Sequence, residues 1–473
     1  KIKTCLGTFT TVNGGLGGSK QPYSSLSRCG ATGTQMYKSM NDLVDFVASC
    51  KRGNLNKRCL RSLCIGVPLI FATHLVEGSQ PILDLIHTRE ELFCESSSIP
   101  NLTDTYLASW HLEKKERSIK FSSPKDEAEL LINYKPSRTN WRVAIITVSD
   151  DQGRKYLQLR LSPNCQIGRI RKLVFDEKGN VDSIQNLEAS TFAVSSTEPQ
   201  NPEFPKKTIH EDTQIDDRSI IALVDTGVNY LLQELYPFIA TDLDGNITGY
   251  DFWDDDQRPF DKDPRSNPFF PLHHGTTVFS VLIRELKGQK VAVYRFPADD
   301  LCKFEQLLAH VETHNIRVVA MPMGSKNKTE WLCFETKARN MPQTIFIVSA
   351  GNNGIDIDKQ AVYPASFDLD NLIVVSSGNK FGLLGPQSNY GRDSVDLVVP
   401  AERIPVIDHR GVKTYASGSS YAVPRVAALV GRYIKSNPQS TSVDVKRFLQ
   451  DRAIPSSKIK LGWIPDPTDD FGF

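Results

Sequence analysis

Two apolar runs that each end in a polar motif constrain the fold of this chain most strongly. The runs occupy residues 220–224 (IIALV) and 344–348 (TIFIV), without the polar alternation of a half-exposed strand. Such runs are typical of strands buried on both faces of a parallel sheet. Asp225 and Ser349 directly follow the runs, so we expect both at the carboxyl ends of strands, the edge where open α/β sheets bind ligands. The sequence therefore predicts an α/β domain with a functional site at that edge.

A serine among small residues is the first candidate for chemistry. Residues 417–424 (SGSSYAVP) precede a predicted helix: Gly418 permits a tight turn, and Pro424 is tolerated in the first helical turn. The amino end of that helix would point its free N–H groups at Ser420, which favours an oxyanion formed there. Turns of this kind are also common structural features, so the run alone does not establish a nucleophile.

A nucleophilic serine needs a general base, and the base needs an orienting carboxylate. Asp225 stands in an Asp-Thr-Gly triplet at the predicted strand end, and His274 stands in a His-Gly-Thr step that begins a predicted helix. His273 is the rival base, but the glycine directly after His274 favours His274 as the residue at the turn. Asn352 follows the second apolar run in Ala-Gly-Asn, where its side chain can donate to an oxyanion together with the Ser420 amide.

In the order Asp, His, Asn, Ser, these segments resemble the subtilisin-like serine proteases, or subtilases, over about residues 205–445. Residues 363–365 (YPA) and 388–391 (SNYG) are similar to further family segments. The resemblance implies a three-layer domain with a mostly parallel sheet, which hydrolyses peptide bonds of a polypeptide substrate without a metal. It assigns Asp225 as orienting carboxylate, His274 as general base, Asn352 as oxyanion donor and Ser420 as nucleophile. It also implies substrate-binding segments formed by Met321, Pro322, Met323, Gly324, Ser349, Ala350 and Gly351.

Two alternatives stay open, one because of departures from the family pattern and one because Asp-Thr-Gly is also a signature of aspartic proteases. Ser419 and Tyr421 flank the serine where the family usually has Thr and Met, and Phe279 stands where a small residue follows the histidine. Pro322 cannot donate a backbone hydrogen bond to an extended substrate. A catalytically inactive subtilase-fold module for binding or regulation is therefore one alternative. An aspartic protease is the other, although the single Asp-Thr-Gly triplet leaves the remaining polar residues unexplained.

The chain is predicted to have four parts. Residues 1–135 form a mainly helical region with a flexible, Gly- and Ser-rich start, and residues 136–198 form a small β-rich subdomain. A proline-containing linker over residues 199–211 leads to the subtilisin-like domain at 212–473. The first 200 residues look unlike the propeptide that many subtilases carry. We expect them to regulate the protease or to dock a specific protein partner.

Composition limits which other partners and which cellular location the sequence predicts. A net charge of +1 without a strong basic patch argues against nucleic acid, and the longest apolar stretch, residues 63–76, is too short to span a bilayer. Nine cysteines without a Cys-x-x-Cys pair indicate neither a zinc site nor a full disulfide framework, which favours a cytoplasmic location. Asn-x-Ser/Thr sequons at Asn101, Asn246 and Asn327 point instead to secretion, the alternative location.

Calcium is the one cofactor that the sequence suggests. Residues 242–256 carry aspartates at 242, 244, 251 and 254–256, and carboxylate oxygens are ligands that calcium prefers. The stretch lacks the ordered ligand pattern of a known calcium loop, so the alternative is a solvated acidic loop.

Overall fold

The structure is a computed structural model that describes residues 111–115, 118–123, 128–136, 141–150, 152–162, 164, 166–206, 221–296 and 300–470. All described residues belong to one compact unit, residues 91–473. The helices expected within residues 1–110 lie outside the described residues. So does the part of the predicted linker at 207–211.

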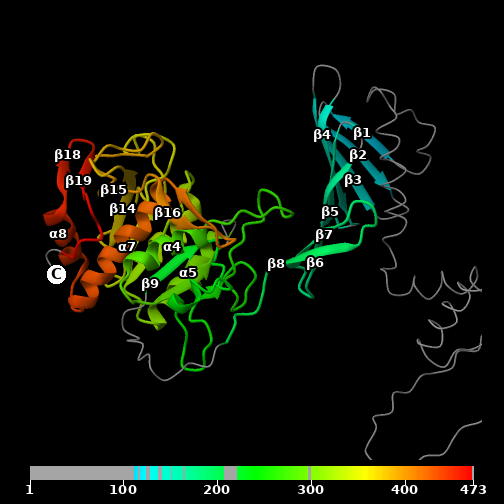
Figure 1. Cartoon of the computed structure of the whole chain (residues 1–473). Coiled ribbons are helices and arrows are strands. Elements are labelled where there is room, and N and C mark those ends of the chain that lie inside the picture. Colours follow the sequence, from blue (N-terminus) through cyan, green and yellow to red (C-terminus); the bar gives the residue numbers. More distant parts are fainter. Residues whose placement is uncertain are drawn as a thin grey trace, which may run out of the picture. The chain divides into compact units, whose positions relative to one another are not determined.

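Eight consecutive antiparallel strands form one sheet in the order β1 to β8 (Figure 1). The strands are β1 (His111–Lys115), β2 (Ser118–Ser123), β3 (Ala128–Pro136), β4 (Trp141–Ser149), β5 (Lys155–Leu161), β6 (Ile167–Phe175), β7 (Val181–Leu187) and β8 (Val194–Pro199). The alternating Leu157, Leu159 and Leu161 of β5 are all buried.

The helical prediction is wrong for residues 111–135, which contain β1, β2 and most of β3. Ile119 and Phe121 recur with the two-residue period of a strand, and they pair in register with Ile132 and Leu130. The period of two is visible in the sequence, but each strand is short and its partner lies on the next strand. The β-rich part therefore extends from His111 to Pro199, upstream of the boundary expected at residue 136.

The C-terminal domain is built on a nine-stranded sheet with the order β10-β11-β9-β12-β13-β14-β15-β19-β18 (Figure 1). All neighbours are parallel except β18 and β19. The strands are β9 (Ile221–Asp225), β10 (Tyr250–Asp251), β11 (Val291–Arg295), β12 (Val318–Met321), β13 (Ile345–Ser349), β14 (Leu372–Gly378), β15 (Leu397–Pro400), β18 (Ile454–Ser456) and β19 (Ile459–Trp463). The predicted α/β fold with a mostly parallel sheet is confirmed.

Helices cover both faces of this sheet. They are α4 (Gly275–Glu285), α5 (Phe304–Thr313), α6 (Leu332–Arg339), α7 (Ser419–Ser436) and α8 (Ser442–Arg452), with short 3-10 turns η4 (Tyr236–Phe238), η5 (Leu301–Lys303) and η6 (Lys328–Trp331). A hairpin of β16 (Ile404–Ile407) and β17 (Lys413–Ala416) also packs on α4.

The pleat of the central strands divides the core in two. Ile221 and Leu223 of β9 face the cluster of α4, α7 and α8, whereas Ala222 and Val224 face the cluster of α5 and α6. Successive side chains of a strand point to opposite faces, so the apolar run of β9 serves both layers. The result is the three-layer arrangement expected for the domain.

The described part of the predicted linker is anchored on the C-terminal domain. Phe204 is buried, with its ring centroid 5.3 Å from that of Tyr230 and 5.2 Å from that of Tyr236. The Tyr230 hydroxyl donates to the carbonyl of Pro202 at 2.5 Å, and the Tyr236 hydroxyl donates to that of Pro205 at 2.7 Å. Prolines in a sequence suggest a free connector, but their carbonyls still accept hydrogen bonds and an aromatic neighbour still needs burial.

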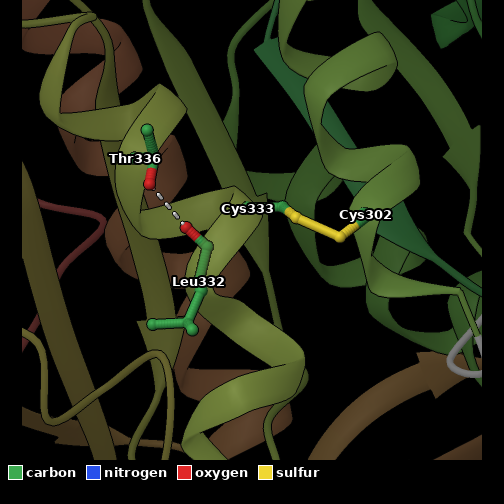
Figure 2. The surroundings of a disulfide bond; sticks show 4 residues. All are labelled: Cys302, Leu332, Cys333 and Thr336. Atoms are coloured by element: carbon green, nitrogen blue, oxygen red, sulfur yellow. Dashed lines mark hydrogen bonds between the residues drawn. A yellow bond between two sulfur atoms is a disulfide. The ribbon is translucent and has the colours of Figure 1, made fainter.

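A disulfide joins Cys302 of η5 to Cys333 of α6 (Figure 2). The two cysteines are 31 residues apart in sequence and meet through the packing of this side of the sheet. Cysteine spacing alone therefore does not predict the bond. Figure 2 also shows the Thr336 hydroxyl donating to the Leu332 carbonyl at 2.9 Å, within the helix that carries Cys333.

Within the described residues, none of the helices combines the length and the apolar character that crossing a membrane requires.

Candidate active site

Asp225 ends β9, an interior strand of the sheet between β11 and β12, as the apolar run predicts. The residue is 3% exposed, and its Oδ1 accepts a hydrogen bond from the Thr226 amide at 2.7 Å. The start of α4 approaches this strand end closely: a Cβ on Gly275 would lie 2.0 Å from the Gly227 carbonyl oxygen and 3.2 Å from the Cβ of Asp225. Gly275 is therefore required for the contact, which explains the glycine after His274.

His274 is the residue that precedes α4, and its ring faces Asp225. The distances from Nδ1 to the two carboxylate oxygens are 2.8 and 2.9 Å. Burial acts to lower the pKa of His274, but the negative charge of Asp225 and the hydrogen bond to it outweigh burial, so the pKa lies above its ordinary value. With Nδ1–H donating to Asp225, the neutral ring keeps Nε2 free to accept a proton.

A second carboxylate, Asp261, fixes the segment around His274. Its Oδ1 accepts from the Thr226 hydroxyl at 2.6 Å and from the His274 amide at 3.3 Å. Its Oδ2 accepts from the amide and the hydroxyl of Thr276, at 3.0 and 2.5 Å. Burial acts to raise the pKa of this wholly buried acid, but the nearby His409, then His273 and the Thr226 hydroxyl, hold the pKa below its ordinary value. Sequence reasoning missed Asp261 because no local pattern marks it.

The rival base His273 has a different role. Its ring stacks on that of His409, with 3.6 Å between centroids and 11° between planes, and its Nδ1 lies 2.6 Å from the Asp261 carbonyl oxygen. Ligand atoms of these two histidines and Asp261 lie within 4.8 Å of one another. However, the nitrogen lone pairs of two parallel stacked rings run side by side and do not converge on one ion. Both Asp261 oxygens also already accept hydrogen bonds. The cluster fits packing and support of the His274 segment better than a metal.

Ser420 lies half-buried in the first turn of α7. Gly418, just before the helix, has a φ of 126°, a conformation that favours glycine, and a Cβ there would lie 3.1 Å from Oδ1 of Asn352. Tyr421 contacts the base side: its ring centroid is 6.0 Å from that of His274, and its hydroxyl is 3.2 Å from Oγ1 of Thr277. Ser420 is thus the neighbour in sequence of a residue whose side chain contacts both His274 and the first turn of α4.

Among the described residues, no hydrogen bond joins the Ser420 hydroxyl to the His274 ring, whose Nδ1 is bonded to Asp225. Contacts of this type are often long without substrate and tighten in the complex.

Ser419, which stands where the family usually has Thr, anchors Asn352. Its amide and its hydroxyl both donate to Oδ1 of Asn352 at 2.9 Å. Its hydroxyl also lies 2.7 Å from the hydroxyl of Ser349 at the end of β13. Because a backbone N–H can only donate, the Asn352 atom that faces it must be the oxygen, and the amide nitrogen points elsewhere.

The predicted substrate-binding residues fall into two groups. The side chains of Met321, Pro322, Ser349 and Ala350 are buried in the domain, so they can offer substrate only backbone groups. Met323 and Gly351 are half-buried, and Gly324 is exposed. The two segments follow the adjacent strands β12 and β13, which places both at the same edge of the sheet as Asp225.

Asp251 and Asp254 of the acidic stretch are paired with protein cations instead of lying free. Asp251 Oδ2 is 2.8 Å from Nη1 of the fully buried Arg295, and Asp254 Oδ2 is 2.6 Å from Nζ of Lys262. Two acids facing two bases carry no net negative charge for calcium. Asp242 is also engaged, because its carboxylate accepts hydrogen bonds from nearby residues of its own turn. These residues therefore do not fit the calcium site that the sequence suggests.

Curated relatives share part of the chain. A cell wall-associated protease of Bacillus subtilis (strain 168) is 24% identical over 263 residues, which cover 53% of this chain and 27% of the relative. Subtilisin-like protease 2 of Plasmodium falciparum (isolate 3D7) is 31% identical over 87 residues, which cover 18% of this chain and 6% of the relative. The aligned parts thus span 27% or less of these relatives.

Among solved structures, a lanthipeptide protease matches with a TM-score of 0.45 and 16% identity, over 53% of this chain and 86% of that one. A cold adapted subtilisin-like serine proteinase matches with a TM-score of 0.42 and 21% identity, over 56% and 94%. The family model of the subtilase family, peptidase S8, matches residues 216–470. That match covers more than half of the chain and includes Asp225, His274, Asn352 and Ser420, so the chain belongs to the subtilase family.

Proposed function

We propose that this chain is a serine endopeptidase that uses Asp225, His274 and Ser420 as its triad. The observation that carries the proposal is the contact of His274 Nδ1 with both oxygens of Asp225, beside the serine turn that begins α7. Ser420 would attack a peptide carbonyl while Nε2 of His274 takes the hydroxyl proton. Asp225 would hold the ring in the required tautomer and stabilise the imidazolium. The same proton would then pass to the leaving amine, and water would hydrolyse the acyl-enzyme.

The oxyanion of the tetrahedral intermediate would be held by two donors, the Asn352 side chain and the Ser420 amide. Ser419 fixes the oxygen of Asn352, which leaves the amide hydrogens of Nδ2 for the oxyanion. The Ser420 amide belongs to the first turn of α7, where N–H groups have no partner within the helix. Loss of one such donor typically slows catalysis about 10²- to 10³-fold.

Hydrolysis of denatured, fluorescently labelled casein tests the proposal. The wild-type protein should release fluorescent peptides, and Ser420→Ala should not. If both proteins leave casein intact while the wild type is folded, the inactive subtilase-fold module becomes the better account. If both release peptides at equal rates, the activity belongs to a contaminant.

Regulation through the N-terminal part is the second element of the proposal. The eight-stranded sheet contacts the segment that leads to His274: Arg171 Nη1 donates to the Phe269 carbonyl at 2.5 Å, and the Phe269 side chain packs with Leu173 and Ile184. A movement of this sheet would therefore displace the segment that leads to His274. Docking of a specific protein partner on the first 200 residues stays a prediction, and residues 1–110 of that region lie outside the described part of the chain.

The disulfide supports an oxidising compartment, which differs from the cytoplasmic expectation. Disulfides such as Cys302–Cys333 persist in secreted and periplasmic proteins and are rare in reducing cytosol. We therefore propose that the catalytic domain folds outside the cytosol. Alkylation of the native protein before and after reduction, followed by peptide mass spectrometry, should show both cysteines blocked only after reduction.

A further inference from the structure

Asn389 makes an unusual set of contacts with the chain on both sides of Asn352. It is fully buried between β14 and β15. Its Nδ2 donates to the Ala350 carbonyl at 2.8 Å, and its Oδ1 accepts from the amides of Asn353 at 2.9 Å and Ile355 at 3.1 Å. One side chain thus binds the backbone on both sides of Asn352: Ala350 before it, and Asn353 and Ile355 after it.

The backbone around Asn389 strengthens this attachment. Its amide donates to the Gly351 carbonyl at 3.1 Å, and its own carbonyl accepts from the Ser376 hydroxyl of β14 at 2.5 Å. Gly351 has a φ of 97°, and a Cβ there would lie 2.6 Å from Nδ2 of Asn389. The turn that carries Asn352 is therefore shaped to receive this side chain, and Asn389 is itself fixed to a central strand.

We infer that Asn389 is a positioning residue for the oxyanion hole, acting through Asn352. The inference rests on the proposed function, because it assumes that Asn352 donates to the oxyanion. A site of this kind requires donors placed before the reaction begins, and a shift of about 1 Å can cost about 10²-fold in rate. Ser419 holds the side-chain oxygen of Asn352, and Asn389 holds its backbone; together they determine where Nδ2 points.

The chemistry of the contact requires an amide. A carbonyl on one side and two N–H groups on the other need one donor and one acceptor from the same short side chain. The substitution Asn389→Asp would keep the acceptor but lose the donor to Ala350. Removal of the side chain would take these partners away from three backbone groups, of which the Ala350 carbonyl is buried, so it also costs stability. Stability and catalysis must therefore be measured separately.

Asn371 provides a matched structural control. It is buried and its Nδ2 donates to three backbone carbonyls, those of Ala338, Met341 and Thr344. These carbonyls belong to α6 and the turn that leads into β13, at the opposite end of the strand from Asn352. Asn371→Ala should lower stability as Asn389→Ala does, without the effect on catalysis.

The test is a double-mutant cycle on the full chain with a fluorophosphonate probe, which forms a tetrahedral adduct on an activated serine. We expect Asn389→Asp and Asn389→Ala to lower the maximal labelling rate about 10- to 100-fold, with probe affinity and the pH midpoint unchanged. Asn371→Ala should label at nearly the wild-type rate. In an Asn352→Ala background, Asn389→Asp should slow labelling less than about twofold, because the residue it positions is already gone.

Three results would overturn the inference. Full additivity with Asn352→Ala would mean that Asn389 acts independently of the oxyanion donor. A rate loss in Asn371→Ala equal to that in Asn389→Ala would mean that the effect is one of stability. If Asn389→Ala does not fold, Asn389→Asp can be measured in its place, because aspartate retains the shape of the asparagine side chain. A wild-type labelling rate in Asn389→Asp would also contradict the positioning role. Failure of the wild type to label would instead overturn the proposed function itself.

Discussion

At the scale of a single residue, two opposing effects act on the pKa of His274. Burial acts to lower its pKa, but the adjacent Asp225 raises it above the ordinary 6.5. Because the pKa is raised on folding, the protonated ring stabilises the fold below its unfolded pKa, and this contribution is lost as pH rises through the folded pKa. Catalysis has the opposite dependence, since the base must be neutral to accept the proton.

Asp225→Asn should therefore change both the rate and its pH dependence. Without the carboxylate, burial is left to lower the pKa of His274, so the midpoint of the labelling-rate profile should move to lower pH. The rate at the plateau should fall about 10³-fold or more, because the wrong tautomer is no longer disfavoured. Fluorophosphonate labelling between pH 5 and pH 9 measures both. An unchanged midpoint would mean that Asp225 does not determine the charge of His274.

The two adjacent histidines offer a matched pair. His274→Gln should abolish labelling, because the base that takes the Ser420 proton is then gone. His273→Gln should retain labelling within about tenfold, since its ring stacks on His409 and bonds to the Asp261 backbone instead of facing the carboxylate of Asp225. Equal losses in both variants, with folding intact by circular dichroism, would contradict the assignment of the base.

At the scale of elements, the disulfide links two segments on the α5 and α6 face of the sheet. Closing a loop of 31 residues restricts the unfolded chain, and the loop-entropy relation gives about 3–4 kcal/mol of stabilisation. This face lies away from α4 and α7, the helices whose first turns hold the candidate active site.

Cys302→Ser should accordingly lower the free energy of unfolding by about 3–4 kcal/mol and leave the labelling rate of the folded protein unchanged. Urea unfolding followed by tryptophan fluorescence gives the first quantity, and the fluorophosphonate probe gives the second. Cys333→Ser should match it, and the double variant should cost no more than either single variant. Additive losses would show that the cysteines do not act as a pair.

The elements also show what could be predicted from the sequence. Apolar runs marked β9 and β13, and the polar residues that follow them marked Asp225 and Asn352, because both signals are local. Asp261 carries no such signal. Ser419 and Asn389 stand in segments that resemble the family, but their contacts cannot be predicted from those segments. All three residues form hydrogen bonds to residues distant in the chain. The helical prediction is wrong for the strands at residues 111–135 because their pairing partners lie on neighbouring strands, which composition does not reveal.

At the scale of the whole molecule, the N-terminal sheet and the catalytic domain share a contact at Phe269. This ring is wholly buried with Leu173 and Ile184, and Lys262 Nζ lies 3.4 Å from the Val181 carbonyl oxygen. The contact involves the segment directly upstream of His274. It is a part of the described chain through which the sheet could influence the base.

Phe269→Ala should therefore weaken the contact, with a loss of about 3–5 kcal/mol typical of a buried Phe. We expect a lower labelling rate at Ser420 and earlier protease cleavage between the sheet and the catalytic domain. Phe381→Ala is the control, because Phe381 is 68% exposed and should affect neither. If Phe269→Ala labels at the wild-type rate, the sheet does not act through the His274 segment.

The most direct test of the central claim is to label the intact protein with a fluorophosphonate probe and to identify the modified peptide by mass spectrometry. The account predicts a single adduct on Ser420, absent in Ser420→Ala and His274→Gln. Labelling of another residue would contradict it. So would no labelling of a folded protein from which residues 1–199 have been removed to uncover the site, a truncation that keeps Phe204 on the catalytic domain. Either result would leave a subtilase fold without serine chemistry at Ser420.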